Sequence, residues 1–215
     1  MRPTYSAIVT ALVLGLCAAP GAAAQVLGLP VNNSGVPTGL GLYADVGFPN
    51  GAAGDGTTFA ASARLGISKI GITATLASFN PSGPNNTITS VGGSFNYKLL
   101  GGPLIPFSAT LQGGIGYGKA AGDVKLWHLP IGMGFAITIP NPALAIKPWI
   151  APRIDLTHAP SPVGWDSNFG FSTGVEFNFL SGLGFQASYD LVFVNGSDPG
   201  IFAIGAHYGL RIPRL

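Results

Sequence analysis

The chain has 215 residues and a formal charge of +2, and its composition is 47% hydrophobic but only 8% charged. Ordinary soluble domains carry about 25% charged residues, so this composition excludes a surface that faces water on all sides. The small charge argues against nucleic-acid binding, and the 33 glycines and 18 prolines argue against a helical fold.

The first 24 residues have the features of a secretory signal peptide. Arg2 supplies a positive charge, and the apolar stretch 7–19 is too short to cross a membrane comfortably. Ala22–Ala24 offers an A-x-A cleavage motif, so the mature chain is expected to begin at Gln25. The alternative is a retained anchor helix.

Cys17, the single cysteine, lies inside the signal peptide. Leu16 stands where a lipoprotein signal needs a small residue, so lipidation is not expected. The mature protein is therefore expected to have no disulfide and no thiol chemistry. Removal of Arg2 leaves nine basic and eight acidic residues.

The rest of the chain alternates between bulky apolar and small or polar residues. Between Ser167 and Leu180 the phenylalanines and Val175 fall on one parity, and Glu176 and Asn178 fall on the other. A period of two is typical of a strand. The same reading predicts ten strands, in a range of 8 to 12, at 39–48, 58–67, 69–79, 88–99, 106–117, 125–139, 145–157, 168–179, 183–194 and 201–211.

We expect three segments: the signal peptide 1–24, an N-terminal linker 25–38 and a strand domain 39–215. The sequence leaves open whether the linker enters the domain as a plug. Prolines 130, 148 and 152 fall inside predicted strands and are interpreted as possible bulges, because proline removes a ladder donor.

The charged residues of the predicted strands share one face. Apart from Lys69 and Lys125 at strand ends, each lies on the parity opposite the bulky apolar residues, and no charge lies in mid-strand on the apolar face. A charge facing hydrocarbon at the bilayer midplane costs about 2–4 kcal/mol for Arg or Lys, whereas water imposes no such cost. We therefore expect lipid outside, a polar lumen inside and a sheet closed on itself, since open edges are excluded from hydrocarbon. The candidate lumen-lining residues are Asp45, Arg64, Lys98, Lys147, Arg153, Asp155, Glu176, Asp190, His207 and Arg211.

The pattern thus predicts an all-β fold: a closed, up-and-down, antiparallel transmembrane β-barrel of about ten strands. The alternative is a secreted soluble β-sandwich or lipocalin-like barrel, which would carry far more lysine and glutamate on its polar face. The more polar connections are expected on the extracellular side, and both chain termini are then expected in the periplasm.

The chain resembles the small outer-membrane β-barrel proteins of Gram-negative bacteria. The most specific part is "AIGAHYGL" at Ala203–Leu210, where Gly205, Tyr208 and Leu210 resemble the assembly signal of those proteins. Ala203 departs from the usual polar residue, and the chain continues through "RIPRL" instead of ending on an aromatic residue. The resemblance implies location in the outer membrane, with membrane lipid, the barrel-assembly machinery and periplasmic chaperones as partners.

Two further features bear on the lumen. Many inward positions are glycine, which suggests either a narrow water-filled path or room for bends and close packing; they are Gly41, Gly71, Gly92, Gly114, Gly132, Gly134, Gly170, Gly174 and Gly205. Register counting places Lys147 opposite or diagonal to Glu176, and Arg64 near Tyr43 and Asp45. Opposite charges on neighbouring strands form ordinary stabilising pairs.

No catalytic constellation is convincing. We interpret His158, near Asp155 and Asp166 at the expected extracellular rim, as a solvent-exposed loop histidine. His128 and His207 each lie alone on the polar face of a predicted strand. "GGIGYGK" at Gly113–Lys119 lacks the context of a phosphate-binding loop. We therefore expect no cofactor and no metal, and a structural role or a narrow passive pore. The alternative is an outer-membrane enzyme or a surface-binding protein that acts through its extracellular loops.

Overall fold

The computed structural model describes residues 26–83, 87–102, 105–120, 124–160, 164–196 and 198–210. Its elements are β1 (Gly39–Pro49), the short 3-10 helix η1 (Gly51–Ala53), β2 (Gly56–Ile67), β3 (Ile70–Pro81), β4 (Ile88–Gly102), β5 (Ile105–Ala120), β6 (Val124–Ile137), β7 (Ile139–Pro140), β8 (Leu144–Ala159), β9 (Gly164–Phe179), β10 (Leu183–Phe193) and β11 (Gly200–Leu210). None of the helices in these ranges is long and apolar enough to cross a membrane.

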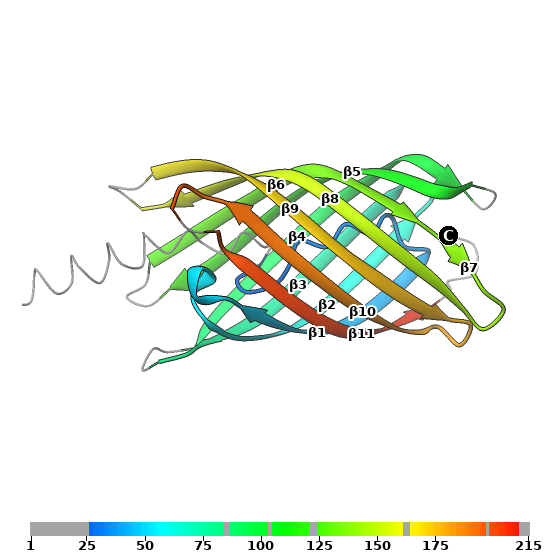
Figure 1. Cartoon of the computed structure of the whole chain (residues 1–215), viewed down its shortest axis with the longest axis horizontal. Helices are drawn as coiled ribbons and strands as arrows, with labels where there is room; N and C mark the ends of the chain where they lie inside the picture. Colours follow the sequence, from blue (N-terminus) through cyan, green and yellow to red (C-terminus); the bar gives the residue numbers. More distant parts are fainter. Residues whose placement is uncertain are drawn as a thin grey trace, which may run out of the picture.

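The strands form one closed barrel. Each pairs antiparallel with its neighbour in the chain, β1 pairs with β11, and β6 pairs with β8 (Figure 1). The two-residue β7 continues β6 along β8 after an interruption at Thr138, so the wall has ten strands. The predicted closed, up-and-down barrel is confirmed, and the strand boundaries agree with the sequence prediction to within four residues.

The three strand prolines do not form bulges, so that prediction is wrong. Pro130 pairs with Asp155, Pro148 with Val175 and Pro152 with Phe171, and the register is the same on both sides of each. A slip by one residue would turn a row of lipid-facing side chains into the lumen, and this holds the register despite the missing donors. The described irregularity lies elsewhere, between β4 and β5, at Lys98–Gly102.

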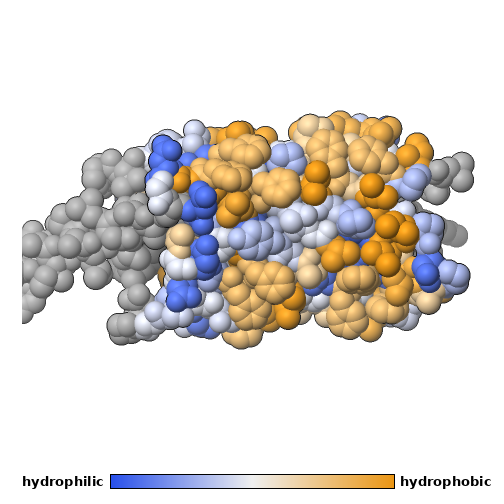
Figure 2. Space-filling view, viewed as in Figure 1, coloured by the Kyte–Doolittle hydropathy of each residue, from blue (hydrophilic) through white to orange (hydrophobic). Residues whose placement is uncertain are grey.

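The outer face of the wall is apolar. Large hydrophobic side chains on it are half exposed, for example Leu76 at 55%, Phe95 at 50% and Ile131 at 51%, whereas Glu176 and Asp190 are buried inside. Figure 2 shows orange, hydrophobic side chains over the middle of the barrel and a blue band near one end. This distribution is the inverse of a soluble barrel, so the soluble alternative is excluded.

Aromatic side chains mark one border of this apolar belt. Tyr117, Trp127, His158 and Trp165 follow one another in register across β5, β6, β8 and β9. Tyr117 and Trp127 have ring centroids 4.8 Å apart, as do His158 and Trp165. Aromatic girdles of this kind lie at the membrane–water interface of transmembrane barrels.

The two ends of the barrel differ. We call the end where β1 begins and β11 ends the turn end, and the opposite end, with the connections that follow β1, β3, β5, β8 and β10, the loop end. The five loop-end connections are the more polar ones and are those expected to face the outside.

The segment that precedes β1 lies inside the barrel, where Figure 1 shows it in blue. We call residues 26–38 the plug. Val26 packs with Leu29, Ala53 and Ile201 at the loop end, whereas Pro37 lies against Gly66 at the turn end. The plug therefore runs through the lumen from one end to the other.

This path corrects one sequence prediction. Both ends of the barrel wall lie at the turn end, but Val26 lies at the loop end, so the two termini of the described chain are not on the same side. The 13 residues before Gly39 can span at most about 43–47 Å when extended, which exceeds the roughly 25 Å of an outer-membrane apolar belt.

Candidate functional site

The plug is held by hydrogen bonds from side chains of the wall. At its loop-end half, the backbone N–H of Leu27 donates to Oγ of Ser90 at 3.2 Å, and Oγ1 of Thr58 donates to the carbonyl of Leu27 at 3.3 Å. In the middle, Nε2 of Gln112 donates to the carbonyl of Asn32 at 3.0 Å. The wall thus binds backbone groups of the plug at two levels of the lumen.

Two plug side chains add contacts with the opposite part of the wall. Nδ2 of Asn32 donates to Oε1 of Gln186 at 3.3 Å, and Oγ of Ser34 donates to Oε1 of Glu176 at 2.5 Å. The Ser34 and Glu176 side chains are both buried. The plug is therefore attached to strands on several sides of the barrel.

Inward glycines make room for the plug. A Cβ at Gly134 would lie 2.4 Å from the carbonyl oxygen of Asn33, one at Gly47 would lie 2.1 Å from that of Gly28, and one at Gly66 would lie 1.8 Å from that of Pro37. Each would overlap the plug backbone. The plug can therefore occupy the lumen only because these wall positions carry no side chain.

Other inward glycines make room for large wall side chains. A Cβ at Gly170 would meet Asp155 and Arg153, one at Gly174 would meet Trp149, and one at Gly205 would meet Asp45. At these three positions the inward glycines therefore allow close packing of side chains and do not leave a water-filled path.

A group of charged residues crosses the lumen toward the turn end; we call Tyr43, Arg64, Lys147 and Glu176 the central cluster. Nη1 of Arg64 lies 3.7 Å from Oε1 of Glu176, although β1, β11 and β10 separate their strands in the wall. The guanidinium of Arg64 also lies 3.8 Å above the ring of Tyr43. The ion pair therefore spans the lumen, and Ser34 binds the same carboxylate oxygen.

The predicted pairing of Lys147 with Glu176 is confirmed, since the two face each other directly between β8 and β9. Lys147 also reaches the plug, because its Nζ would lie 3.4 Å from a Cβ at Gly35. The predicted proximity of Arg64 and Tyr43 is likewise confirmed. Glu176 thus lies among two cations and one hydroxyl.

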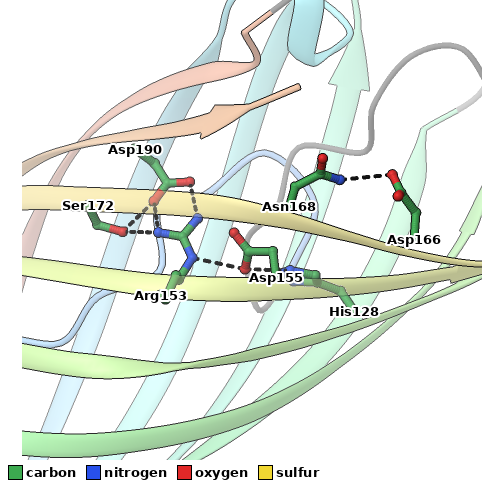
Figure 3. Close-up of polar contacts among 7 residues, drawn as sticks. All are labelled: His128, Arg153, Asp155, Asp166, Asn168, Ser172 and Asp190. Carbon is green, nitrogen blue, oxygen red and sulfur yellow. Dashed lines mark hydrogen bonds and ion pairs between the residues drawn. The ribbon is translucent and has the colours of Figure 1, made fainter. Parts of the chain in front are cut away.

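A second group of polar side chains lies nearer the loop end; we call His128, Arg153, Asp155, Ser172 and Asp190 the outer cluster (Figure 3). Nη1 and Nη2 of Arg153 donate to Oδ1 and Oδ2 of Asp190 at 2.7 and 2.8 Å, and its Nε donates to Oδ1 of Asp155 at 2.9 Å. Nε2 of His128 lies 2.8 Å from Oδ1 of Asp155, and Ser172 bonds Asp190. The outer cluster joins β6, β8, β9 and β10.

The remaining predicted lumen residues are placed as follows. Asp45 is buried and accepts a hydrogen bond from Nε2 of Gln186. His207 stacks on Tyr43 with centroids 4.7 Å apart, and its Nε2 lies 3.0 Å from Oδ1 of Asn178. Nζ of Lys98 donates to the carbonyl of Ser68 at 3.5 Å, at the turn end. Arg211 lies outside the described residues.

Most of the rim and assembly positions lie outside the lumen. His158 packs against Trp165 on the outer face, with the two rings tilted by 52°, and is not brought to Asp155. Asp166 accepts a hydrogen bond from Nδ2 of Asn168 at 2.8 Å. Tyr208 and Leu210 are exposed on the lipid-facing side, at 48% and 42%. Gly205 instead faces the lumen beside Asp45.

Sequence reasoning missed three features: the path of the plug, the cross-lumen pair of Arg64 with Glu176, and the pair of His128 with Asp155. The inward glycines were a signal for the first. No sequence signal identified the Arg64–Glu176 pair, because it joins strands that are not neighbours. Among the described residues, no group of three or more His, Cys, Asp or Glu side chains could hold a metal ion.

A small cavity remains between the plug and the wall. It measures about 30 Å³, and Asn32, Asp45, Ser62 and Arg64 contribute to its lining. A buried water needs roughly 10–15 Å³ of such space, so the cavity holds about two waters. This cavity is too small to hold a hydrated ion.

Comparisons with known proteins identify the fold. No protein-family model matches the chain, and no curated protein matches it. Among solved structures, the chain is similar to the β domain of the Bordetella autotransporter BrkA, with 11% identity, 80% of this chain and 98% of that chain covered, and a TM-score of 0.54.

Two further matches are more distant. An outer membrane channel from Pseudomonas putida matches with 9% identity, over 84% of this chain and 98% of that chain, at a TM-score of 0.47. A bacterial polysaccharide outer membrane secretin matches with 9% identity over 73% of this chain, at a TM-score of 0.48, and the chain spans only 57% of that structure's length.

The closed barrel and its match to the BrkA β domain show the fold of the bacterial outer-membrane β-barrel proteins. A closed barrel with an apolar outer belt and a charged interior requires a bilayer around it. The fold and the belt together place the protein in the bacterial outer membrane.

Proposed function

We propose that the protein is a narrow pore whose own plug closes it in the resting state. The observation that carries this proposal is the path of residues 26–38, which run through the lumen between the two ends of the barrel. With the plug in place we expect a very low conductance, because the plug backbone fills the space beside Gly47, Gly66 and Gly134.

The way the plug is held supports a closure that can open. The strand pairings that build the wall include no plug residue, so the wall ladder closes without it. Both amide atoms of Asn33 are buried without a partner among the described residues. Each unsatisfied buried polar group costs on the order of 1–3 kcal/mol, which lowers the free energy needed to remove the plug.

Proteolytic cleavage of the backbone between the plug and β1 in the folded protein tests this proposal. A site-specific protease recognition sequence is inserted after Thr38, which is exposed at the turn end. The variant is folded into lipid vesicles, cut, washed and fused to a planar bilayer. We expect almost no current before the cut, and a small, steady current once a gel shows that the fragment has been released.

A matched control carries the same recognition sequence after Asn195, an exposed loop-end position. Cutting there leaves the plug joined to β1, so the current should not change. The pore proposal fails if the uncut protein conducts as well as the cut one. It also fails if the fragment is released and the barrel stays silent, a result that would favour a structural role.

Assembly partners belong to the same proposal. Tyr208 and Leu210 project from the last strand toward lipid, where the barrel-assembly machinery could bind them before β11 pairs with β1. Replacement of Tyr208 by Ala should slow the appearance of the heat-resistant folded form in cells. An unchanged rate would contradict this role for the last strand.

A further inference from the structure

The contacts of the plug show what kind of ligand the lumen accepts. Of the five hydrogen bonds described between plug and wall, three use plug backbone groups, namely the N–H and carbonyl of Leu27 and the carbonyl of Asn32. Every polypeptide offers such groups. These three contacts do not depend on the plug's side chains.

The wall groups that make these contacts meet the plug at two places, and the first is a turn, in which the N–H of Leu29 donates to the carbonyl of Val26 at 3.4 Å and Gly28 has a φ of 74°. Ser90 and Thr58 bind residue 27 near the loop end, and Gln112 binds residue 32 farther along the lumen. Ser90, Thr58 and Gln112 are all buried polar residues that project inward from β4, β2 and β5. Because these groups are held at fixed positions in the wall, they can pair with the backbone of a new polypeptide at the same places once the plug has left.

The lumen also suits an uncharged chain. Residues 26–38 contain no charged side chain. The charges of the central cluster pair with one another across the lumen, through Arg64 and Glu176. Val31 and Val36 are buried in the lumen, at 0% and 7% exposure, so small apolar side chains also fit.

We propose that the lumen is a binding site for an uncharged polypeptide segment with a glycine turn, and that residues 26–38 are its intramolecular ligand. A second peptide of this kind takes the place of the plug. This inference rests on the proposed function in one respect, since the plug must be able to leave.

Peptide binding in trans tests the inference directly. The variant cut after Thr38 is washed free of its fragment, and a fluorescently labelled synthetic peptide of residues 26–38 is added. We expect saturable binding by fluorescence anisotropy. A peptide with Ser34→Ala should bind at least about tenfold more weakly, because it lacks the bond to a charged acceptor.

Two wall variants separate backbone recognition from side-chain recognition. Gln112→Ala removes a contact with the plug backbone, so it should weaken the native and Ser34→Ala peptides by the same factor. Glu176→Gln should weaken the native peptide and leave the Ser34→Ala peptide nearly unchanged. A peptide with Gly28→Val should bind much more weakly than the native peptide, because a Cβ at Gly28 would lie 1.9 Å from Oγ1 of Thr58.

Three results would overturn the inference: no saturable binding of the native peptide up to millimolar concentration, no effect of Gln112→Ala, or equal binding of the native and Gly28→Val peptides. If the cut barrel loses its heat-resistant form, the same titration is made on the uncut Ser34→Ala chain, where the native peptide should still displace the weakened plug. Absence of binding there would also overturn it.

Fluorescence anisotropy measures peptide binding without any current through the barrel. The pore and the peptide-binding site are therefore tested separately. A cut barrel that is silent but binds the peptide contradicts only the pore. A cut barrel that conducts, and whose current no peptide reduces, contradicts only the peptide site.

Discussion

The hydroxyl of Ser34 donates a hydrogen bond of 2.5 Å to Oε1 of Glu176, a residue 142 positions farther along the chain. The same oxygen lies 3.7 Å from Nη1 of Arg64 on the far side of the lumen. One carboxylate thus joins the plug, β2 and β9. Any movement of the plug out of the lumen must break this contact.

The first prediction follows from this contact. Ser34→Ala should raise the fraction of time that single uncut proteins spend open in a planar bilayer. A hydrogen bond to a charged group contributes about 1.5–3 kcal/mol, so the open population should rise by roughly 10- to 100-fold. Thr38→Ala, an exposed plug position, is the control. Equal open times for the two variants would contradict a role for Ser34 in closure.

The second prediction concerns Arg153, which binds Asp190 through two nitrogens and Asp155 through a third. Arg153→Met leaves two buried carboxylates without this cation and should lower the free energy of unfolding by about 3–5 kcal/mol. Adding Asp190→Asn to Arg153→Met should recover part of that loss. Urea titration of protein folded in vesicles measures both, and a double variant less stable than the single one would count against the ion pair.

The third prediction concerns the charges that line the plug-free lumen toward the turn end. Replacement of both Lys98 and Lys147 by Gln removes two inward positive charges and leaves Asp45 and Glu176 in place. The reversal potential of the cut protein in a salt gradient should then shift toward cation selectivity. Lys119→Gln with Lys125→Gln, at the loop end, is the matched control. An open pore with unchanged selectivity would exclude a basic constriction.

The fourth prediction uses two adjacent residues of β9 that face opposite ways. Phe177→Arg places a guanidinium against lipid and should cost up to about 2–4 kcal/mol near the midplane, and less toward the interface. Asn178→Arg keeps the charge in the lumen and should cost on the order of 1 kcal/mol, for the lost bond to His207. Heat-modifiable gel shift and urea titration compare them, and greater damage from Asn178→Arg would reverse the assigned faces.

The wall was predictable from the sequence because lipid imposes a strict rule on every second residue. The alternation around Glu176 and Phe177 determines both the face and the register, and the latter also places Lys147 opposite Glu176. Strand prolines suggested bulges that are absent, because the apolar alternation outweighs single missing donors. The strand periodicity therefore predicts the architecture better than local proline signals do.

The site was less predictable because its contacts join distant parts of the chain. The plug has no strand period, and nothing in residues 26–38 shows which end of the barrel they approach. Gly134 indicated space in the lumen, but its occupant, the plug backbone, appears only in three dimensions. His128 looked isolated because its partner, Asp155, comes from β8.

The position of the plug itself is the central claim, and thiol accessibility measures it most directly. Val31 has no exposed surface inside the lumen, whereas Thr38 is exposed at the turn end. Val31→Cys and Thr38→Cys are each folded into vesicles and treated with a bulky, polar thiol reagent. We predict that Cys at position 38 reacts within minutes and that Cys at position 31 is protected at least about a hundredfold until the protein is unfolded. Equal labelling rates at the two positions would contradict a plugged lumen.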